Sequence, residues 1–160
     1  MAGIVIVAHT PVASAMLGFV EHTFGALPER IRAVDIPPHE DIKASFDRVL
    51  KAAYGVNSGN GVLILTDVMG ATPANVASKL EGLGPLSGLN TPVIVLAGLN
   101  LPMLMRCISH RTEDLEELAK KALAGGQNGI LRRTGICLLP KLRSSINWVC
   151  TLGHLPSYRN

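Results

Sequence analysis

The sequence has few charged and few aromatic residues, and it lacks any long apolar run. Of its 160 residues, 17% are charged and 4% are aromatic, whereas 48% are hydrophobic. The apolar runs, such as those at 62–65 and 92–99, are far too short to span a bilayer, and no basic stretch precedes an apolar one at the N-terminus. We therefore expect neither membrane insertion nor export, and a compact α/β domain rich in aliphatic residues.

Acidic residues are absent after position 117. Residues 1–117 carry a formal charge of −4 and residues 118–160 carry +7. A basic tail can bind nucleic acid. Here, however, the basic residues are not spaced along one face, which favours a solvated or disordered tail. We therefore expect no nucleic-acid partner.

Cysteines are also scarce, and several familiar motifs are missing. Cys107, Cys137 and Cys150 have no metal-ligand spacing, and an odd, scattered set favours reduced thiols in a cytoplasmic protein without a metal. The chain contains no G-x-x-x-x-G-K-[ST], no G-x-G-x-x-G after a strand, no G-x-S-x-G and no C-x-x-C. The glycine-rich stretch 55–61 precedes a strand, so it lies at the wrong end of a parallel sheet to bind phosphate.

What is present is an alternation of strands and helices. Thr10 is a candidate helix cap with Pro11 in the first turn, and Gly55 and the pair at 125–126 are candidate helix ends. We predict strands at 3–8, 31–36, 62–66 and 92–99, helices from Val12 and at 40–54, 72–80, 101–108 and 113–124, and a loop at 82–90. This alternation predicts a three-layer α/β/α fold with a mainly parallel sheet of four or five strands, central order 2-1-3-4.

The pattern breaks down beyond residue 126. Residues 129–133 can form one short strand, an antiparallel edge strand near the C-terminus, and the sequence after them keeps neither a strand period nor a helix period. We therefore predict a domain at 1–130 and an atypical basic tail at 131–160. Disorder or a shift of reading frame near 128–133 would each account for such a tail. We expect the tail to matter for assembly and not for chemistry.

Two polar residues fall where a ligand site is expected. In an open parallel sheet, ligands bind outside the carboxyl ends of the strands where the strand order reverses, here between the first and third strands. His9 ends the first strand and Asp67 follows the third, and the loop 68–72 leads into a helix N-terminus that can hold an anion. Alternatively, His9 is a polar strand end, Asp67 is a turn residue, and Thr72 is a helix cap in either case.

This set suits phosphoryl transfer through histidine. A neutral imidazole is a good nucleophile near physiological pH. A carboxylate that accepts a hydrogen bond from one ring nitrogen fixes the tautomer, aims the other nitrogen at phosphorus and stabilises the positive charge that develops on the ring. Donors at the helix N-terminus would offset charge on the phosphoryl oxygens.

Three stretches resemble the mannose-type enzyme IIA family of the bacterial sugar phosphotransferase system. They are G-I-V-I-V-A-H at the start, L-T-D-V-M-G-A-T-P-A-N-V-A in the middle and A-G-L-N-L-P-M-L-M later, and the match covers about residues 1–130. The resemblance implies that His9 accepts phosphate from the phosphocarrier protein HPr and passes it to a histidine of a cognate enzyme IIB, with Asp67 as its hydrogen-bond partner. It also implies a phosphate site lined by Thr10, Met69, Gly70, Ala71 and Thr72.

The resemblance carries further implications. Members of this family are cytoplasmic, need no metal or cofactor and are commonly homodimers that exchange a C-terminal strand. The sequence departs from the family where Thr10 replaces a frequent Gly, where Gly70-Ala71-Thr72-Pro73 replaces Gly-Gly-Ser-Pro, and in the tail. Ala71 tolerates a positive φ less well than Gly. The alternative function is a flavodoxin-like module that binds an anion or a partner at the same crevice without turnover.

Overall fold

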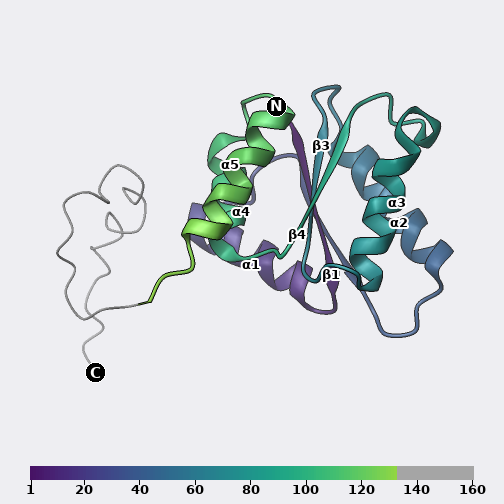
Figure 1. The fold of residues 1–160 in the computed structure, drawn as a ribbon, viewed down its shortest axis with the longest axis horizontal. Coiled ribbons are helices and arrows are strands. Elements are labelled where there is room, and N and C mark those ends of the chain that lie inside the picture. The colour runs from purple at the N-terminus through teal and green to yellow at the C-terminus, as the bar shows by residue number, and fades with distance from the viewer. Residues whose placement is uncertain (133–160) are drawn as a thin grey trace. The chain divides into compact units, whose positions relative to one another are not determined.

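Four parallel strands form one sheet in the computed structural model, which describes residues 1–132 (Figure 1). They are β1 (Gly3–His9), β2 (Ile31–Ile36), β3 (Val62–Thr66) and β4 (Val93–Ala97). Their order is β2-β1-β3-β4. The predicted order 2-1-3-4 is confirmed, and β1 and β3 are neighbours whose carboxyl ends lie together.

Helices cover both faces of the sheet, as predicted. On one face lie α1 (Val12–Phe24), α4 (Leu101–His110) and α5 (Leu115–Asn128), and on the other lie α2 (Ile42–Val56) and α3 (Thr72–Leu83) (Figure 1). Alternate residues of β1 serve the two faces: Ile4 and Ile6 pack on the α1 side, and Val5 and Val7 on the α2 side. A strand covered on both faces must be apolar throughout, which explains the unbroken apolar run at the start of the chain.

Three predicted helix ends are wrong, and contacts between elements accompany two of these differences. Helix α2 runs through Gly55 and ends at Val56, and its C-cap residue, Asn57, donates from its amide Nδ2 to the Leu89 carbonyl at 2.9 Å. Helix α3 continues to Leu83, and a 3₁₀ helix, η1 (Gly84–Ser87), occupies part of the predicted loop. Helix α5 runs through its glycine pair, because a Cβ at Gly126 would lie 3.0 Å from Met103 Cε in α4. Those glycines permit the close approach of two helices.

The expected edge strand near the C-terminus does not appear within the described residues. Residues 129–132 form no strand, and Arg133 lies outside the described part. At β4, the carboxylate Oε1 of Glu81 accepts a hydrogen bond from the Val95 N–H at 3.1 Å. The chain divides into two units, Met1–Ile130 and Leu131–Asn160. The predictions for a disordered or frame-shifted tail fall almost wholly at 133–160, outside the described residues.

No helix within residues 1–132 is both long enough and apolar enough to cross a membrane.

Gly3 provides a stability test of the fold at the start of β1. A Cβ at this position would lie 2.6 Å from the carbonyl oxygen of Val56, a backbone atom that cannot move aside cheaply. We expect Gly3→Ala to lower the free energy of unfolding by about 1–3 kcal/mol, as overpacking does. Gly18→Ala is the control: Gly18 lies in the interior of α1 with open space around it, so the change should stabilise the protein by about 1 kcal/mol. Urea denaturation measures both, and an unchanged midpoint for Gly3→Ala would contradict the packing described.

Candidate functional site

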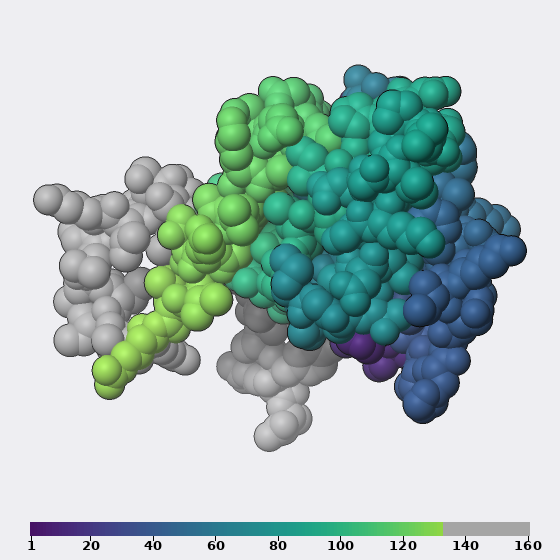
Figure 2. Space-filling view, turned by 45° about the vertical axis from the view of Figure 1, so that its right-hand side comes forward, coloured from purple at the N-terminus to yellow at the C-terminus, as the bar shows by residue number. Residues whose placement is uncertain are grey.

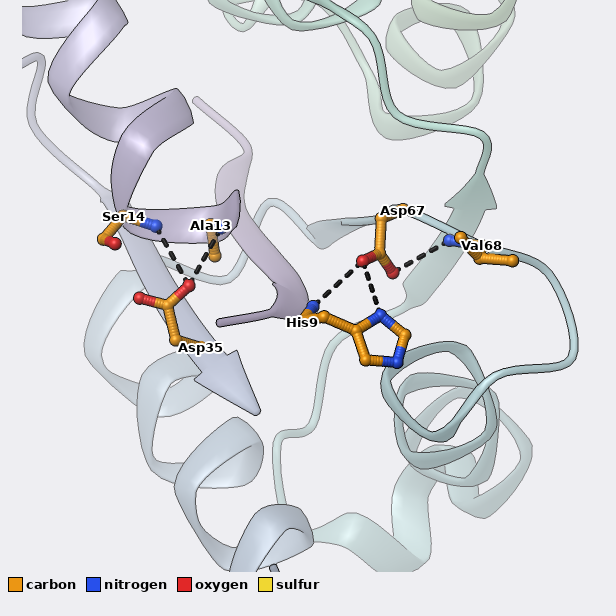
Figure 3. Close-up of polar contacts among 6 residues, drawn as sticks. All are labelled: His9, Ala13, Ser14, Asp35, Asp67 and Val68. Carbon is orange, nitrogen blue, oxygen red and sulfur yellow. Dashed lines mark hydrogen bonds and ion pairs between the residues drawn. The ribbon is translucent and has the colours of Figure 1, made fainter. Parts of the chain in front are cut away.

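The carboxyl ends of β1 and β3 bring His9 and Asp67 together. His9 is the last residue of β1, and Asp67 follows directly on the last residue of β3. The ring nitrogen Nδ1 of His9 lies 2.8 Å from the carboxylate Oδ2 of Asp67 (Figure 3). Sequence reasoning placed both residues at this switch point, and the structure puts their side chains in direct contact.

Asp67 is held by three donors. Its Oδ2 accepts the His9 backbone N–H at 2.9 Å as well as the ring contact, and its Oδ1 accepts the Val68 N–H at 2.8 Å. The side chain is 13% exposed. Burial by itself raises the pKa of this carboxyl, but the hydrogen bonds from His9 and Val68 outweigh it, so the pKa of Asp67 lies below its ordinary value. The group is therefore an anion at neutral pH.

The charge on Asp67 fixes the tautomer of His9. An ionised carboxylate only accepts hydrogen bonds, so Nδ1 must carry the proton and donate it. In the neutral imidazole the other ring nitrogen, Nε2, then carries the lone pair. It lies on the side of the ring away from Asp67 (Figure 3), and the His9 side chain is 49% exposed. The arrangement presents an oriented nucleophile to solvent.

Asp67 also predicts a pH dependence of stability. Because the pKa of its carboxyl in the folded state lies below the ordinary value of 3.8, ionised Asp67 stabilises the fold above that value, and this contribution is lost as the pH falls through the folded pKa. We expect wild type to be more stable than Asp67→Asn at pH 7, with the difference shrinking on acidification below about pH 4. Urea unfolding across this range measures it. A difference independent of pH would show that the charge of Asp67 does not stabilise the fold.

The loop after Asp67 ends at an uncapped helix. Ala71, with φ −82°, is the N-cap of α3, and no side chain caps the helix. The prediction that Thr72 caps α3 is therefore wrong: Thr72 is the first helical residue. Gly70 takes the positive φ of the turn, 81°, so the replacement of glycine by Ala71 causes no strain. No acceptor among the described residues pairs with the N–H groups of Gly70 and Thr72, so both can bind an anion.

The other helix of the crevice is capped by a residue that sequence reasoning missed. Thr10 does not cap α1; Pro11 occupies the N-cap position after a cis Thr10–Pro11 bond. Instead Asp35, on β2, accepts the N–H groups of Ala13 at 2.9 Å and Ser14 at 3.2 Å through its Oδ1 (Figure 3). The only sequence signal was an acid within an otherwise apolar strand end, V-D-I.

Two further predicted residues, Thr10 and Met69, belong to the segments that follow β1 and β3. The Thr10 N–H donates to the Ile36 carbonyl at 3.2 Å, so only its hydroxyl remains for a ligand. Met69 is 77% exposed and Val68 56% exposed.

A hollow of about 230 Å³ lies beside the start of α3, on the face where α2 and α3 lie side by side (Figure 2). It is lined by Ile42, Thr72, Asn75, Val76 and Lys79. A larger hollow of about 530 Å³ lies away from the site, at the amino ends of the strands.

The comparison with known protein families decides the family. The family model EIIA-man, described as the PTS system fructose IIA component, matches residues 3–123. This chain belongs to that family. Its members are IIA components of the phosphotransferase system, so the predicted membership of the mannose-type enzyme IIA family is confirmed.

Individual relatives agree with this placement. The chain is 28% identical over 129 residues to the PTS system mannose-specific EIIAB component of Escherichia coli K12, covering 79% of this chain and 38% of that protein. It therefore spans well under half the length of the curated relatives that it matches.

Solved structures show that the fold of this chain is also similar to that of phosphotransferase system IIA proteins. The phosphotransferase system component EIIA of Streptococcus agalactiae superposes with a TM-score of 0.72 at 28% identity, over 82% of this chain and 97% of that one. The mannose/sorbose-specific IIA subunit of Enterococcus faecalis superposes equally well, TM-score 0.72, over 86% of this chain and 98% of that one, but at 21% identity it supports the fold alone.

Proposed function

We propose that this chain is a histidine phosphocarrier that accepts a phosphoryl group from phosphorylated HPr on Nε2 of His9 and passes it to a histidine of a cognate enzyme IIB, in sugar uptake or a regulatory relay. The observation that carries the proposal is the Nδ1 contact with Asp67 at 2.8 Å. In the neutral imidazole this contact leaves the lone pair on Nε2, at the carboxyl edge of the sheet, where the loop after Asp67 leads to the uncapped N-terminus of α3. Family membership supports the same chemistry.

The transfer balances without a co-reactant. The Nε2 lone pair attacks phosphorus, an N–P bond forms, and the N–P bond of the donor phosphohistidine breaks with its electron pair returning to the donor imidazole. Nδ1–H of His9 stays hydrogen bonded to Asp67, whose negative charge stabilises the cationic ring that results. Transfer to enzyme IIB is the same step with a new acceptor, so His9 returns to its starting state.

Backbone and hydroxyl groups are available to hold the phosphoryl oxygens. The N–H groups of Gly70 and Thr72 are unpaired among the described residues and lie at the positive end of α3. The hydroxyls of Thr10 and Thr72 add donors, and the exposed Met69 and half-buried Ala71 complete the predicted lining. We infer that the phosphoryl group lies between Nε2 and the first turn of α3, with no metal or cofactor.

The exposure of the site suits a protein donor. His9 is half exposed, and Val68 and Met69 beside Asp67 present apolar side chains to solvent. Such a surface can dock against another protein and exclude water during transfer. We further propose that the chain acts as a cytoplasmic homodimer, with HPr and enzyme IIB as successive partners.

Charge should steer the encounter with HPr. Residues 1–117 carry a charge of −4, and we expect a basic rim around the active histidine of HPr. Phosphorylation by limiting HPr should therefore slow as salt rises, because exposed charges are screened over about 8 Å at physiological ionic strength. Initial rates measured at increasing salt, with enzyme I in excess, test this. A rate that is flat across the series would assign docking to the apolar surface of Val68 and Met69 instead.

The relay itself can be followed with labelled phosphoenolpyruvate. Enzyme I and HPr are charged first, this protein is added, and enzyme IIB follows. We expect the label to appear on this protein and then to leave it for enzyme IIB. Label that stays on HPr, with both partners shown to be active on a known enzyme IIA, would overturn the proposed function.

A further inference from the structure

Two helices begin at the crevice that holds His9, and they differ in whether a side chain caps the N-terminus. Helix α1 starts three residues after His9, and α3 starts five residues after Asp67. Both N-termini lie at the carboxyl edge of the sheet, and each offers a positive dipole end and backbone N–H groups to an anion. The order of the elements therefore gives a phosphoryl group on His9 two helix N-termini that could bind it.

The N-terminus of α1 is capped by an anionic side chain, the carboxylate of Asp35. Asp35 comes from β2, where it is paired in register with Ala8, the residue before His9. Its Oδ1 accepts two α1 amides, Ala13 at 2.9 Å and Ser14 at 3.2 Å. Figure 3 shows the result: one carboxylate on each side of His9, Asp67 on the imidazole and Asp35 on the helix.

The N-terminus of α3 has been left open. Its N-cap residue, Ala71, has no side-chain acceptor, and the second helical residue is Pro73, which has no N–H. A serine, threonine or aspartate at position 71 would be able to cap the helix itself. The described part of the chain therefore satisfies one helix with a carboxylate 21 and 22 residues away in sequence and supplies no side chain to the other.

We propose that Asp35 is a positioning residue that confines the phosphoryl group to the α3 side of His9. Its carboxylate uses two of the first N–H donors of α1, those of Ala13 and Ser14, and places a negative charge there, so a phosphate dianion meets both fewer donors and like-charge repulsion. The inference rests on the proposed function, because it assigns a direction to the phosphoryl group that His9 would carry. The positive dipole end of α3 then acts on that group without competition from α1.

Amide shifts caused by inorganic phosphate test the proposal without any partner protein. In ¹⁵N-labelled wild type, we expect phosphate to shift the amides of Gly70 and Thr72 in a saturable way and to leave those of Ala13 and Ser14 unmoved. In Asp35→Ala, the amides of Ala13 and Ser14 should also shift in a saturable way, because their N–H groups have lost the acceptor that they have in wild type. Asp35→Asn keeps an oxygen acceptor for the two amides but removes the negative charge, so the shifts at Ala13 and Ser14 should be smaller than in Asp35→Ala.

A matched control separates this role from general helix capping. Asp114 caps α5 at the other end of the sheet, accepting the Glu117 N–H at 3.0 Å. Asp114→Ala removes another aspartate that caps a helix N-terminus and should leave phosphate shifts at all four site amides unchanged. If it alters them as Asp35→Ala does, the effect is one of stability and the proposal fails.

The outcomes separate this inference from the proposed function. Shifts at Ala13 and Ser14 in wild type as large as those at Gly70 and Thr72 would overturn it, and so would silence at Ala13 and Ser14 in a folded Asp35→Ala protein. Because wild type alone gives the first of these tests, a variant that fails to fold does not block it. If phosphate behaves as expected but HPr never labels His9, the proposed function fails alone; if HPr labels His9 while Ala13 and Ser14 stay silent in Asp35→Ala, only this inference fails.

Discussion

Replacing His9 with alanine is expected to abolish phosphorylation by HPr. This imidazole lies at the end of a central strand, where Nδ1 is hydrogen bonded to Asp67 and Nε2 has no partner among the described residues. Phosphohistidine is a phosphoramidate, so the label on wild type should be lost in acid and retained in alkali. Label transfer from HPr, followed by acid and alkali treatment, measures both points.

The control for this variant is another exposed histidine. His22 lies near the end of α1, where the structure gives it no carboxylate partner among the described residues. His22→Ala should be phosphorylated at the wild-type rate, and both variants should unfold at a similar urea concentration. Acid-labile phosphate persisting on His9→Ala would remove His9 from the mechanism.

Asp67→Asn is expected to slow phosphoryl transfer by about a hundredfold or more, the loss typical when one preorganised electrostatic group is removed. The reason is specific to the geometry. Both carboxylate oxygens of Asp67 accept hydrogen bonds, from His9 on one side and Val68 on the other. Asparagine has one acceptor oxygen, so its amide nitrogen must face one of these donors, and the negative charge that stabilises the phosphorylated ring is gone.

Rapid-quench transfer from phosphorylated HPr measures the rate of this variant. Asp114→Asn supplies the matched control, since it changes an aspartate at the N-cap of α5, away from the site, and should leave the rate at the wild-type value. A normal rate for Asp67→Asn would reduce Asp67 to a turn residue, the alternative that the sequence left open.

The strand order and the meeting of His9 with Asp67 could be predicted because both follow from local patterns. Residues 3–8 and 62–65 are apolar throughout, which identifies buried parallel strands, and the first ionisable residue beyond each run, His9 or Asp67, must lie at the carboxyl edge. Parallel pairing then brings the two ends together without any knowledge of side-chain geometry.

The caps of the two helices could not be predicted, because they depend on contacts distant in sequence. Local rules assign Thr10 and Thr72 as caps from the Thr-Pro pattern. In the structure, α1 is capped by Asp35 of β2, the strand next to β1, and α3 has no side-chain cap. The glycine pair of α5 could not be interpreted from sequence for the same reason. Local rules predict a helix end there, whereas in the fold the pair contacts α4.

The central claim is that one phosphoryl group is carried on His9, and intact mass measured after incubation with phosphoenolpyruvate, enzyme I and HPr tests it most directly. The account predicts a stoichiometric gain of one phosphoryl group, located by fragmentation at neutral or alkaline pH on the peptide that contains His9, and no gain when HPr is omitted. No gain with active partners, or a gain located on any other residue, would contradict it.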